Sequence, residues 1–220
     1  MSKAWGRIVL KGAWMAAIGG MCALALSSGL LQAEIAGRMV LEDFQAKGPN
    51  GLPKDWKAQN SEAKARDTYM LAAGEEAAFL SARKADQRIY KRNIDWNPKA
   101  APTLTWRWRL KSAPASAEPI AAVFVSLDTD LMVIPVSNKY VWSATKAKGS
   151  VTDGGVFAAS EIVVRSGLQP VGEWVEERVN VYEDFKKIHG HEPAAKAWGI
   201  SLLGGPGVEV DFGPLTASAP

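Results

Sequence analysis

Two arginines at alternate positions of one segment are the first candidates for binding chemistry. Between residues 103 and 110, Thr103, Thr105, Arg107 and Arg109 alternate with apolar residues. Successive side chains of a β-strand point to opposite faces, so the pattern predicts a half-buried strand with both guanidinium groups on its polar face. Because arginine binds carboxylates and phosphates through paired hydrogen bonds, this face is a candidate site for an anion. The interpretation that we favour is a solvated face on which both arginines pair with acidic residues.

Further arginines and aromatic residues extend this candidate site. Arg165 and Arg88 stand in other predicted strands and could accompany the first two arginines. Flat aromatic rings can stack on sugars, and nine tryptophans are available in the chain. Trp96 lies in a polar stretch, and Tyr140 and Trp142 share one face of a strand, so these three are the candidates for a glycan-binding surface. The alternative is that they fill the core, where such rings bury a large area.

Recognised catalytic motifs are absent from the sequence. It has no Gly-x-Ser-x-Gly, no His-Glu-x-x-His and no glycine-rich phosphate loop. Glu173 and Glu177 fall on one face near Trp174, and a glycosidase needs two carboxylates about 5–10 Å apart. No feature of the sequence marks either glutamate as a catalytic acid, so we favour a non-catalytic domain and keep a carbohydrate-active hydrolase as an alternative.

The sequence predicts no cofactor and no metal site. Asp128-Thr129-Asp130 lacks the other acidic positions of a calcium loop, so a turn is the favoured interpretation. The two histidines, His189 and His191, would need further ligands to hold zinc.

Residues 1–33 have the three-part pattern of a secretory signal peptide. Lys3, Arg7 and Lys11 form a basic start, an uncharged and largely apolar stretch follows, and small residues precede a cleavage position after Ala33. The alternative is an uncleaved anchor, because about 20 apolar residues can span a bilayer. Glycines and serines dilute the stretch, which favours cleavage. We therefore expect a periplasmic protein with no membrane contact after cleavage.

Removal of this segment changes the charge balance. It holds three of the 26 basic residues and none of the 23 acidic ones, so residues 34–220 have 23 of each and a formal charge of zero. A neutral domain gives no support for nucleic-acid binding. The one cysteine, Cys22, leaves with the segment, so no disulfide holds the domain.

The remaining sequence is a succession of short strands separated by turns. The predicted strands cover residues 39–44, 68–73, 77–81, 88–95, 103–110, 120–127, 140–144, 160–165, 198–203 and 208–212. The apolar face of the 103–110 strand contains Trp106 and Trp108, which we place in the core. This pattern predicts one all-β domain over residues 34–220, a β-sandwich of the jelly-roll kind, with a closed barrel as second choice.

One short helix interrupts the strands near the C-terminal third. Asn180 can cap its start, with Glu183 three residues later. Val181, Phe185 and Ile188 recur at helical spacing. Gly190 can end the helix in the left-handed conformation.

Several segments of the chain follow a known pattern: Leu104-Thr105-Trp106-Arg107-Trp108, Tyr140-Val141-Trp142, Ile162-Val163-Val164-Arg165-Ser166-Gly167, Gly172-Glu173-Trp174 and the Asn180–Lys187 segment, with Leu52-Pro53-Lys54-Asp55-Trp56 upstream. Through these segments the chain resembles the domain-of-unknown-function family 3047 of exported bacterial proteins. The resemblance implies an exported protein and assigns no activity. The general layout is also similar to carbohydrate-binding sandwich modules, at the level of fold alone.

Three functions remain open from the sequence. The favoured one is an exported, non-catalytic β-sandwich that binds a glycan or a small anionic ligand. The alternatives are the hydrolase using Glu173 and Glu177, and a structural domain that binds an envelope protein partner.

Overall fold

The computed structural model describes residues 37–84, 87–130, 134–155 and 158–220. The predicted signal peptide and its cleavage position lie outside these residues. The fold below is that of the unit Arg38–Pro220.

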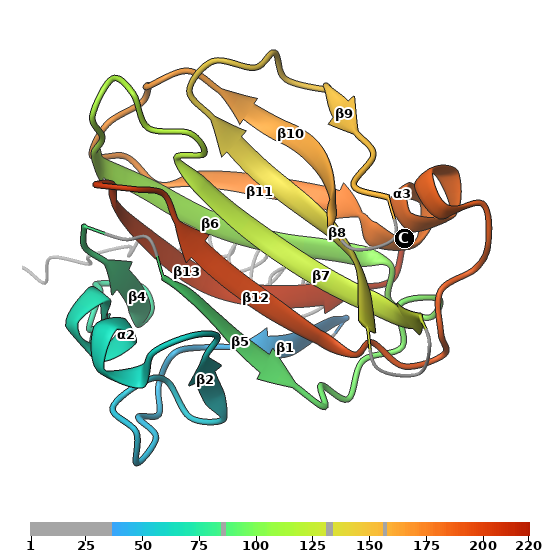
Figure 1. The fold of residues 1–220 in the computed structure, drawn as a ribbon. Helices are drawn as coiled ribbons and strands as arrows, with labels where there is room; N and C mark the ends of the chain where they lie inside the picture. The colour runs from blue at the N-terminus through green and yellow to red at the C-terminus, as the bar shows by residue number, and fades with distance from the viewer. Residues whose placement is uncertain (1–36, 85–86, 131–133, 156–157) are drawn as a thin grey trace, which may run out of the picture. The chain divides into compact units, whose positions relative to one another are not determined.

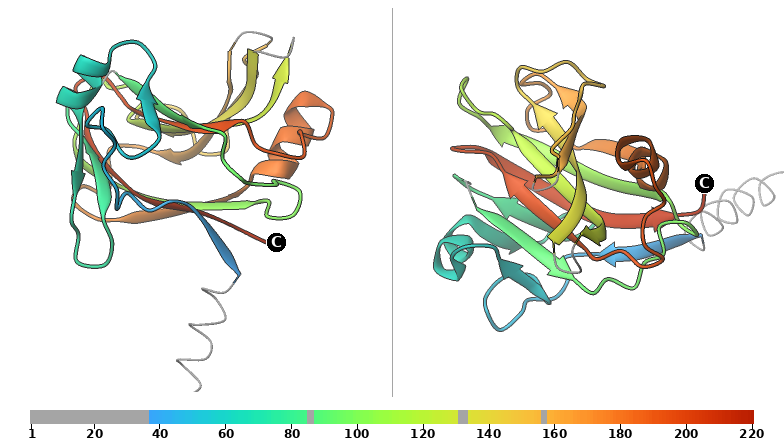
Figure 2. Two further views of the ribbon diagram at one scale, coloured as in Figure 1. Left: turned by 90° about the horizontal axis from the view of Figure 1, so that it is seen from below. Right: turned by 45° about the vertical axis from the view of Figure 1, so that its right-hand side comes forward.

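Two β-sheets lie face to face in this unit (Figures 1 and 2). The six-stranded sheet has the order β11 (Val175–Asn180), β6 (Thr103–Ser112), β13 (Glu209–Ser218), β4 (Phe79–Ala82) and β3 (Tyr69–Ala72), with β1 (Arg38–Glu42) also paired to β13. The seven-stranded sheet has the order β2 (Trp56–Ala58), β5 (Arg88–Arg92), β12 (Gly199–Gly204), β7 (Ala121–Asp130), β8 (Ile134–Ser143), β10 (Ser160–Ser166) and β9 (Val151–Thr152). All pairs are antiparallel except β8 with β10. The predicted β-sandwich of the jelly-roll kind is confirmed.

Alternation along each strand decides which side chains enter the core. On β6, Trp106 and Trp108 are 1% and 0% exposed, whereas Arg107 and Arg109 between them reach the outer surface. The seven-stranded sheet follows the same rule, with Val123 and Val125 inside and Phe124 outside on β7. Each sheet therefore turns one face toward the core, and the outer face carries polar side chains together with, on the seven-stranded sheet, a small buried apolar cluster of Ala122, Phe124 and Val141.

An aromatic cluster joins the two sheets through the core. Trp106 contacts Tyr140 of the opposite sheet with ring centroids 5.9 Å apart, and Trp108 contacts Trp142 at 5.6 Å. Tyr140 and Trp142 are both fully buried. The prediction that these two residues contribute to a binding surface is therefore wrong, because the face that they share points inward.

The polar atoms of Tyr140, Trp142 and Trp96 have partners within the fold, whereas the buried Nε1 of Trp106 has none among the described residues. The Tyr140 hydroxyl donates to Asp184 Oδ2 at 3.0 Å, and burial raises the pKa of this tyrosine well above its usual value. Trp142 Nε1 donates to the Gly167 carbonyl at 2.7 Å. Trp96 is 1% exposed and its Nε1 donates to the Ala101 carbonyl at 2.8 Å, so its predicted place on the surface is wrong as well.

Two helices are present in the described part of the chain, at opposite ends of the sandwich (Figure 1). The predicted helix is α3 (Val181–His189), in which the Asn180 side chain accepts from the Glu183 backbone N–H and Gly190 adopts a left-handed conformation. The second helix, α2 (Glu62–Thr68), was not predicted from the sequence. It begins at Ser61, whose side chain accepts from the Lys64 N–H, and it has only seven residues.

Candidate functional site

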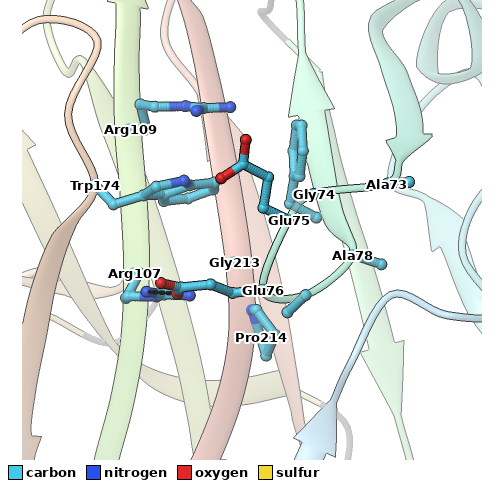
Figure 3. Close-up of a pocket in the computed structure, with 12 residues that line it drawn as sticks. Ala73, Gly74, Glu75, Glu76, Ala78, Arg107, Arg109, Trp174, Gly213 and Pro214 are labelled. Carbon is cyan, nitrogen blue, oxygen red and sulfur yellow. Dashed lines mark hydrogen bonds and ion pairs between the residues drawn. The ribbon is translucent and has the colours of Figure 1, made fainter.

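A cavity of about 410 Å³ lies on the outer surface of the six-stranded sheet. Arg107 and Arg109 of β6 form one side, and the 73–78 turn between β3 and β4 forms the other (Figure 3). Trp174, which directly precedes β11, lies between the two arginines (Figure 3). We call this cavity the Trp174 pocket.

Arg109 is fixed by a buried carboxylate on the neighbouring strand. Asp211 of β13 lies directly opposite Arg109 in the antiparallel register and is 3% exposed. One of its oxygens, Oδ2, accepts from Arg109 Nε at 2.9 Å and from Nη2 at 2.7 Å. A charge-assisted contact of this kind holds the guanidinium plane in one orientation.

Arg107 pairs with a carboxylate from the turn instead. Its Nη1 donates to Glu76 Oε2 at 2.8 Å, and the Glu76 side chain is 76% exposed. A bulge at Gly213 and Pro214 of β13 leaves space beside Arg107. An added Cβ at Gly213 would lie 3.4 Å from the Arg107 Cβ and 3.6 Å from the Trp174 ring, so a larger side chain would occupy the pocket.

The Trp174 ring is held between the two guanidinium groups. The Cζ atoms of Arg109 and Arg107 lie 4.5 Å and 5.6 Å from a ring centroid of Trp174, on its two sides (Figure 3). Phe79 of β4 meets the same indole edge-on, with centroids 5.6 Å apart. Cation–π and edge contacts of this kind order the cluster. Because guanidinium groups cover both ring faces, the indole cannot stack on a sugar in this arrangement.

Carboxylates as well as guanidinium groups surround the Trp174 ring. Glu75 and Glu76 bring carboxylates from the turn, and the Glu75 carboxylate points toward Trp174 and Arg109 (Figure 3). With Asp211 behind Arg109, the positive charge of the two arginines is balanced by nearby acids. Both arginines therefore pair with acidic residues, as the interpretation of a solvated face predicted. The same residues form a pocket with both hydrogen-bond donors and acceptors.

The two expected companion arginines lie elsewhere. Arg165 of β10 donates through Nε to Glu177 Oε1 of β11, the edge strand of the other sheet, and so links the two sheets. Arg88 of β5 lies on the outer surface of the seven-stranded sheet. Neither lines the Trp174 pocket. Sequence alternation places a side chain on one face of its own strand, but it does not say which sheet the strand joins.

The glutamates of the hydrolase alternative do not form a pair on one surface. Glu177 is 6% exposed, and its Oε1 accepts from Arg165 Nε and from Trp108 Nε1, the latter at 3.2 Å. Glu173 is exposed and precedes β11. Glu177 therefore has a structural contact in place of a reacting partner, and the geometry does not support this hydrolase.

Trp174 and the 73–78 turn are the functional candidates that sequence reasoning missed. Glu176 lies opposite Arg107 in the β11–β6 register, and this pairing brings Trp174 beside Arg109. The sequence signal available was Gly172-Glu173-Trp174, a turn with an aromatic residue directly before a strand. β11 itself was not among the predicted strands.

The described residues contain no group of three or more His, Cys, Asp or Glu side chains that could hold a metal ion. None of their helices has the length and apolar character needed to cross a membrane.

The family described as "Protein of unknown function (DUF3047)" matches residues 134–203, from β8 to β12, and the predicted resemblance is thereby confirmed. No curated protein matches the chain.

Several solved structures are similar at low identity. A family 11 carbohydrate-binding module from Clostridium thermocellum, in complex with a β-1,3-1,4-mixed-linked tetrasaccharide, has a TM-score of 0.48 and 8% identity over 83% of this chain and 96% of its own. The family 11 module of cellulosomal cellulase Lic26A-Cel5E of the same organism has a TM-score of 0.46 and 9% identity over 84% and 95%. Endoglucanase 3 of family GH12 from Trichoderma harzianum has a TM-score of 0.41 and 11% identity over 83% and 97%. Each TM-score is below 0.5, so none of these similarities carries a function over to this chain.

Proposed function

We propose that the protein is a glycan-binding module and that the Trp174 pocket is its binding site. The observation that carries the proposal is the mixture of donors and acceptors around one ordered aromatic ring. Arg107 and Arg109 supply N–H donors, and Glu75 and Glu76 supply carboxylate acceptors. A sugar hydroxyl is both a donor and an acceptor, so neighbouring hydroxyls are recognised best where both kinds of group stand side by side.

The charge balance of the pocket favours a neutral sugar over a free anion. Asp211 and Glu76 already neutralise the two guanidinium groups, and Glu75 adds another negative charge. An incoming carboxylate or phosphate would meet these acids as well as the arginines, and like charges at short range oppose binding. The volume of about 410 Å³ lies within the usual range for a small-ligand pocket.

Isothermal titration with a panel of neutral oligosaccharides tests this function. We expect saturable binding by the wild-type protein and at least about tenfold weaker binding by Trp174→Ala, because the indole holds both arginines in place. Arg178→Gln is the matched control, since Arg178 is an exposed β11 residue outside the pocket. Failure of every neutral glycan to bind would contradict the proposal and favour the envelope-partner alternative. Equal binding by Trp174→Ala would contradict the assignment of the Trp174 pocket as the site.

We also propose that the protein is exported to the periplasm. Support comes from the basic start and the apolar stretch of residues 1–33 and from the small residues before Glu34. Mass spectrometry of the protein recovered from a periplasmic extract should give an N-terminus at Glu34. A chain that begins at Met1 in the membrane fraction would show that the segment stays attached as an anchor.

A further inference from the structure

A second cavity, of about 330 Å³, lies on the outer surface of the seven-stranded sheet. The alternation of side chains along β5 and β12 explains which residues line it, because the neighbours of each core residue in the strand point outward. Ile89 of β5 is buried in the core, so Arg88 and Tyr90 face out, and Ser201 on β12 lies opposite Tyr90 in the register. We call this cavity the Arg88 groove.

Among the described residues, Arg88 has no ion pair with a carboxylate. Its guanidinium carbon lies 3.8 Å from the centroid of the Phe124 ring, and Nη2 donates to Ser201 Oγ at 3.1 Å. Its Nε is buried and has no acceptor among the described residues. A buried donor without an acceptor is unusual in a folded protein, and a bound ion is one of the recognised explanations for it.

The surroundings do not neutralise this charge. No Asp or Glu is present among the described residues that line the groove. The acids that pair with lysines of this sheet have other partners: Glu42 binds Lys91, and Glu161 binds Lys139, whose Nζ lies 5.7 Å from the centroid of the same Phe124 ring. Burial lowers the pKa of Arg88 to about 10, so the group is still charged at neutral pH, but its charge is destabilised by the fold.

A second arginine extends the positive surface along β5. The Arg92 guanidinium carbon lies 4.1 Å from the centroid of a Trp198 ring and 4.9 Å from that of Tyr90. Residues four positions apart on a strand are separated by about 13 Å, so Arg92 would contact a different part of the ligand from Arg88. The buried Ser126 and Ser137 hydroxyls, 2.7 Å apart, add polar groups to the lining.

We propose that the Arg88 groove binds the oxyanion of a carboxylate-, phosphate- or sulfate-bearing ligand, with Arg88 as its anchor. An oxyanion supplies both the negative charge and the acceptors that this arginine lacks, and hydrogen bonds between two charged groups are the strongest of their kind. The proposal does not depend on glycan binding at the Trp174 pocket, because the two cavities belong to different sheets.

Titration with four probes at constant ionic strength tests the proposal. The probes are inorganic phosphate, sulfate, glucuronate and, as a neutral counterpart of the last, glucose. We expect at least one of the three anions to bind the wild-type protein and glucose not to bind in this groove. Which anion binds most tightly separates a phosphate, a sulfate and a sugar-acid source.

Arg88→Met removes the charge and keeps most of the side-chain volume. We expect it to weaken anion binding at least about tenfold, while the matched variant Arg178→Gln leaves the affinity unchanged. In the absence of ligand, Arg88→Met should unfold at the same temperature as the wild type or higher, because it removes an unpaired charge from a partly buried position. A merely structural arginine would give the opposite result, a lower unfolding temperature.

Three results would overturn the proposal. They are the failure of all three anions to bind the wild type, unchanged anion affinity in Arg88→Met, and weaker anion binding in Arg178→Gln equal to that in Arg88→Met.

Discussion

On the six-stranded sheet Arg107 and Arg109 each pair with a carboxylate, whereas on the seven-stranded sheet Arg88 contacts a serine hydroxyl and an aromatic ring and pairs with no carboxylate of the described residues. Both surfaces are the solvent-facing sides of one sandwich, and both combine arginine with aromatic rings. The difference lies in the acids. A balanced cluster suits a ligand that both donates and accepts hydrogen bonds, and an unbalanced one suits an anion. The number of arginines on a surface therefore does not identify its ligand, because the carboxylates paired with them determine whether the surface suits a neutral or an anionic ligand.

Asp211→Asn should have the largest effect on the difference between the two surfaces, because it removes the carboxylate partner of Arg109. It leaves Arg109 charged, without its buried carboxylate, and should lower the free energy of unfolding by about 2 kcal/mol in a urea titration. The six-stranded sheet would then resemble the other surface, so we also expect new binding of inorganic phosphate. Asp95→Asn is the control, because its ion pair with Lys196 is exposed and contributes little. Equal effects of the two variants would show that the buried pair does not order the pocket.

Ser201→Asp should convert the Arg88 groove into a balanced surface. The new carboxylate would stand where a serine oxygen now accepts from Arg88, and it should stabilise the protein by about 1 kcal/mol relative to Ser201→Asn. The same variant should lose its response to phosphate and glucuronate. Retained anion binding in Ser201→Asp would mean that Arg88 is not the anchor.

The pH dependence of stability tests whether Glu161 on the seven-stranded sheet is held in ion pairs with Lys139 and Lys146. Burial raises the pKa of Glu161, but hydrogen bonds from Lys146 and Lys139 outweigh it and lower the pKa below 4.5. An acid with a lowered pKa stabilises the fold above its unfolded value, and that stability is lost as the pH falls through the folded value. The wild type should therefore be more stable than Glu161→Gln near neutral pH, and the gap should narrow below pH 4.5. A gap that does not change with pH would exclude these ion pairs as its cause.

Glu76→Gln should have the smallest effect. The carboxylate is on an exposed turn, where a single ion pair contributes little, so we expect no measurable change in unfolding temperature. Glycan affinity should fall a few-fold, because the pocket loses one acceptor. Glu173→Gln, a change at an exposed residue outside the pocket, should leave the affinity as it is. A larger loss in Glu173→Gln than in Glu76→Gln would move the site away from the turn.

The faces of single strands were predictable from the sequence, and so was the capped helix. Alternation in 103–110 placed Arg107 and Arg109 outside and Trp106 and Trp108 inside, as observed. Asn180 and Gly190 begin and end α3 because capping depends on a few neighbouring residues.

The composition of the candidate site was less predictable, since it depends on contacts between distant segments. Trp174 reaches Arg109 only through the pairing of β11 with β6, and Asp211 reaches it through β13, 102 residues away in sequence. Tyr140 and Trp142 were assigned to the surface because sequence alone does not show which face of β8 meets the opposite sheet. Arg88 was recognised as a candidate but was expected beside Arg107 and Arg109.

Fluorine NMR of the protein labelled with 5-fluorotryptophan tests the two-surface account most directly. Trp174 reports on the pocket of the six-stranded sheet and Trp198 on the groove of the other, and Trp174→Phe and Trp198→Phe assign their signals. The account predicts that a neutral oligosaccharide shifts the Trp174 signal alone and that phosphate, sulfate or glucuronate shifts the Trp198 signal alone. Anions that move the Trp174 signal, or neutral glycans that move only the Trp198 signal, would contradict it.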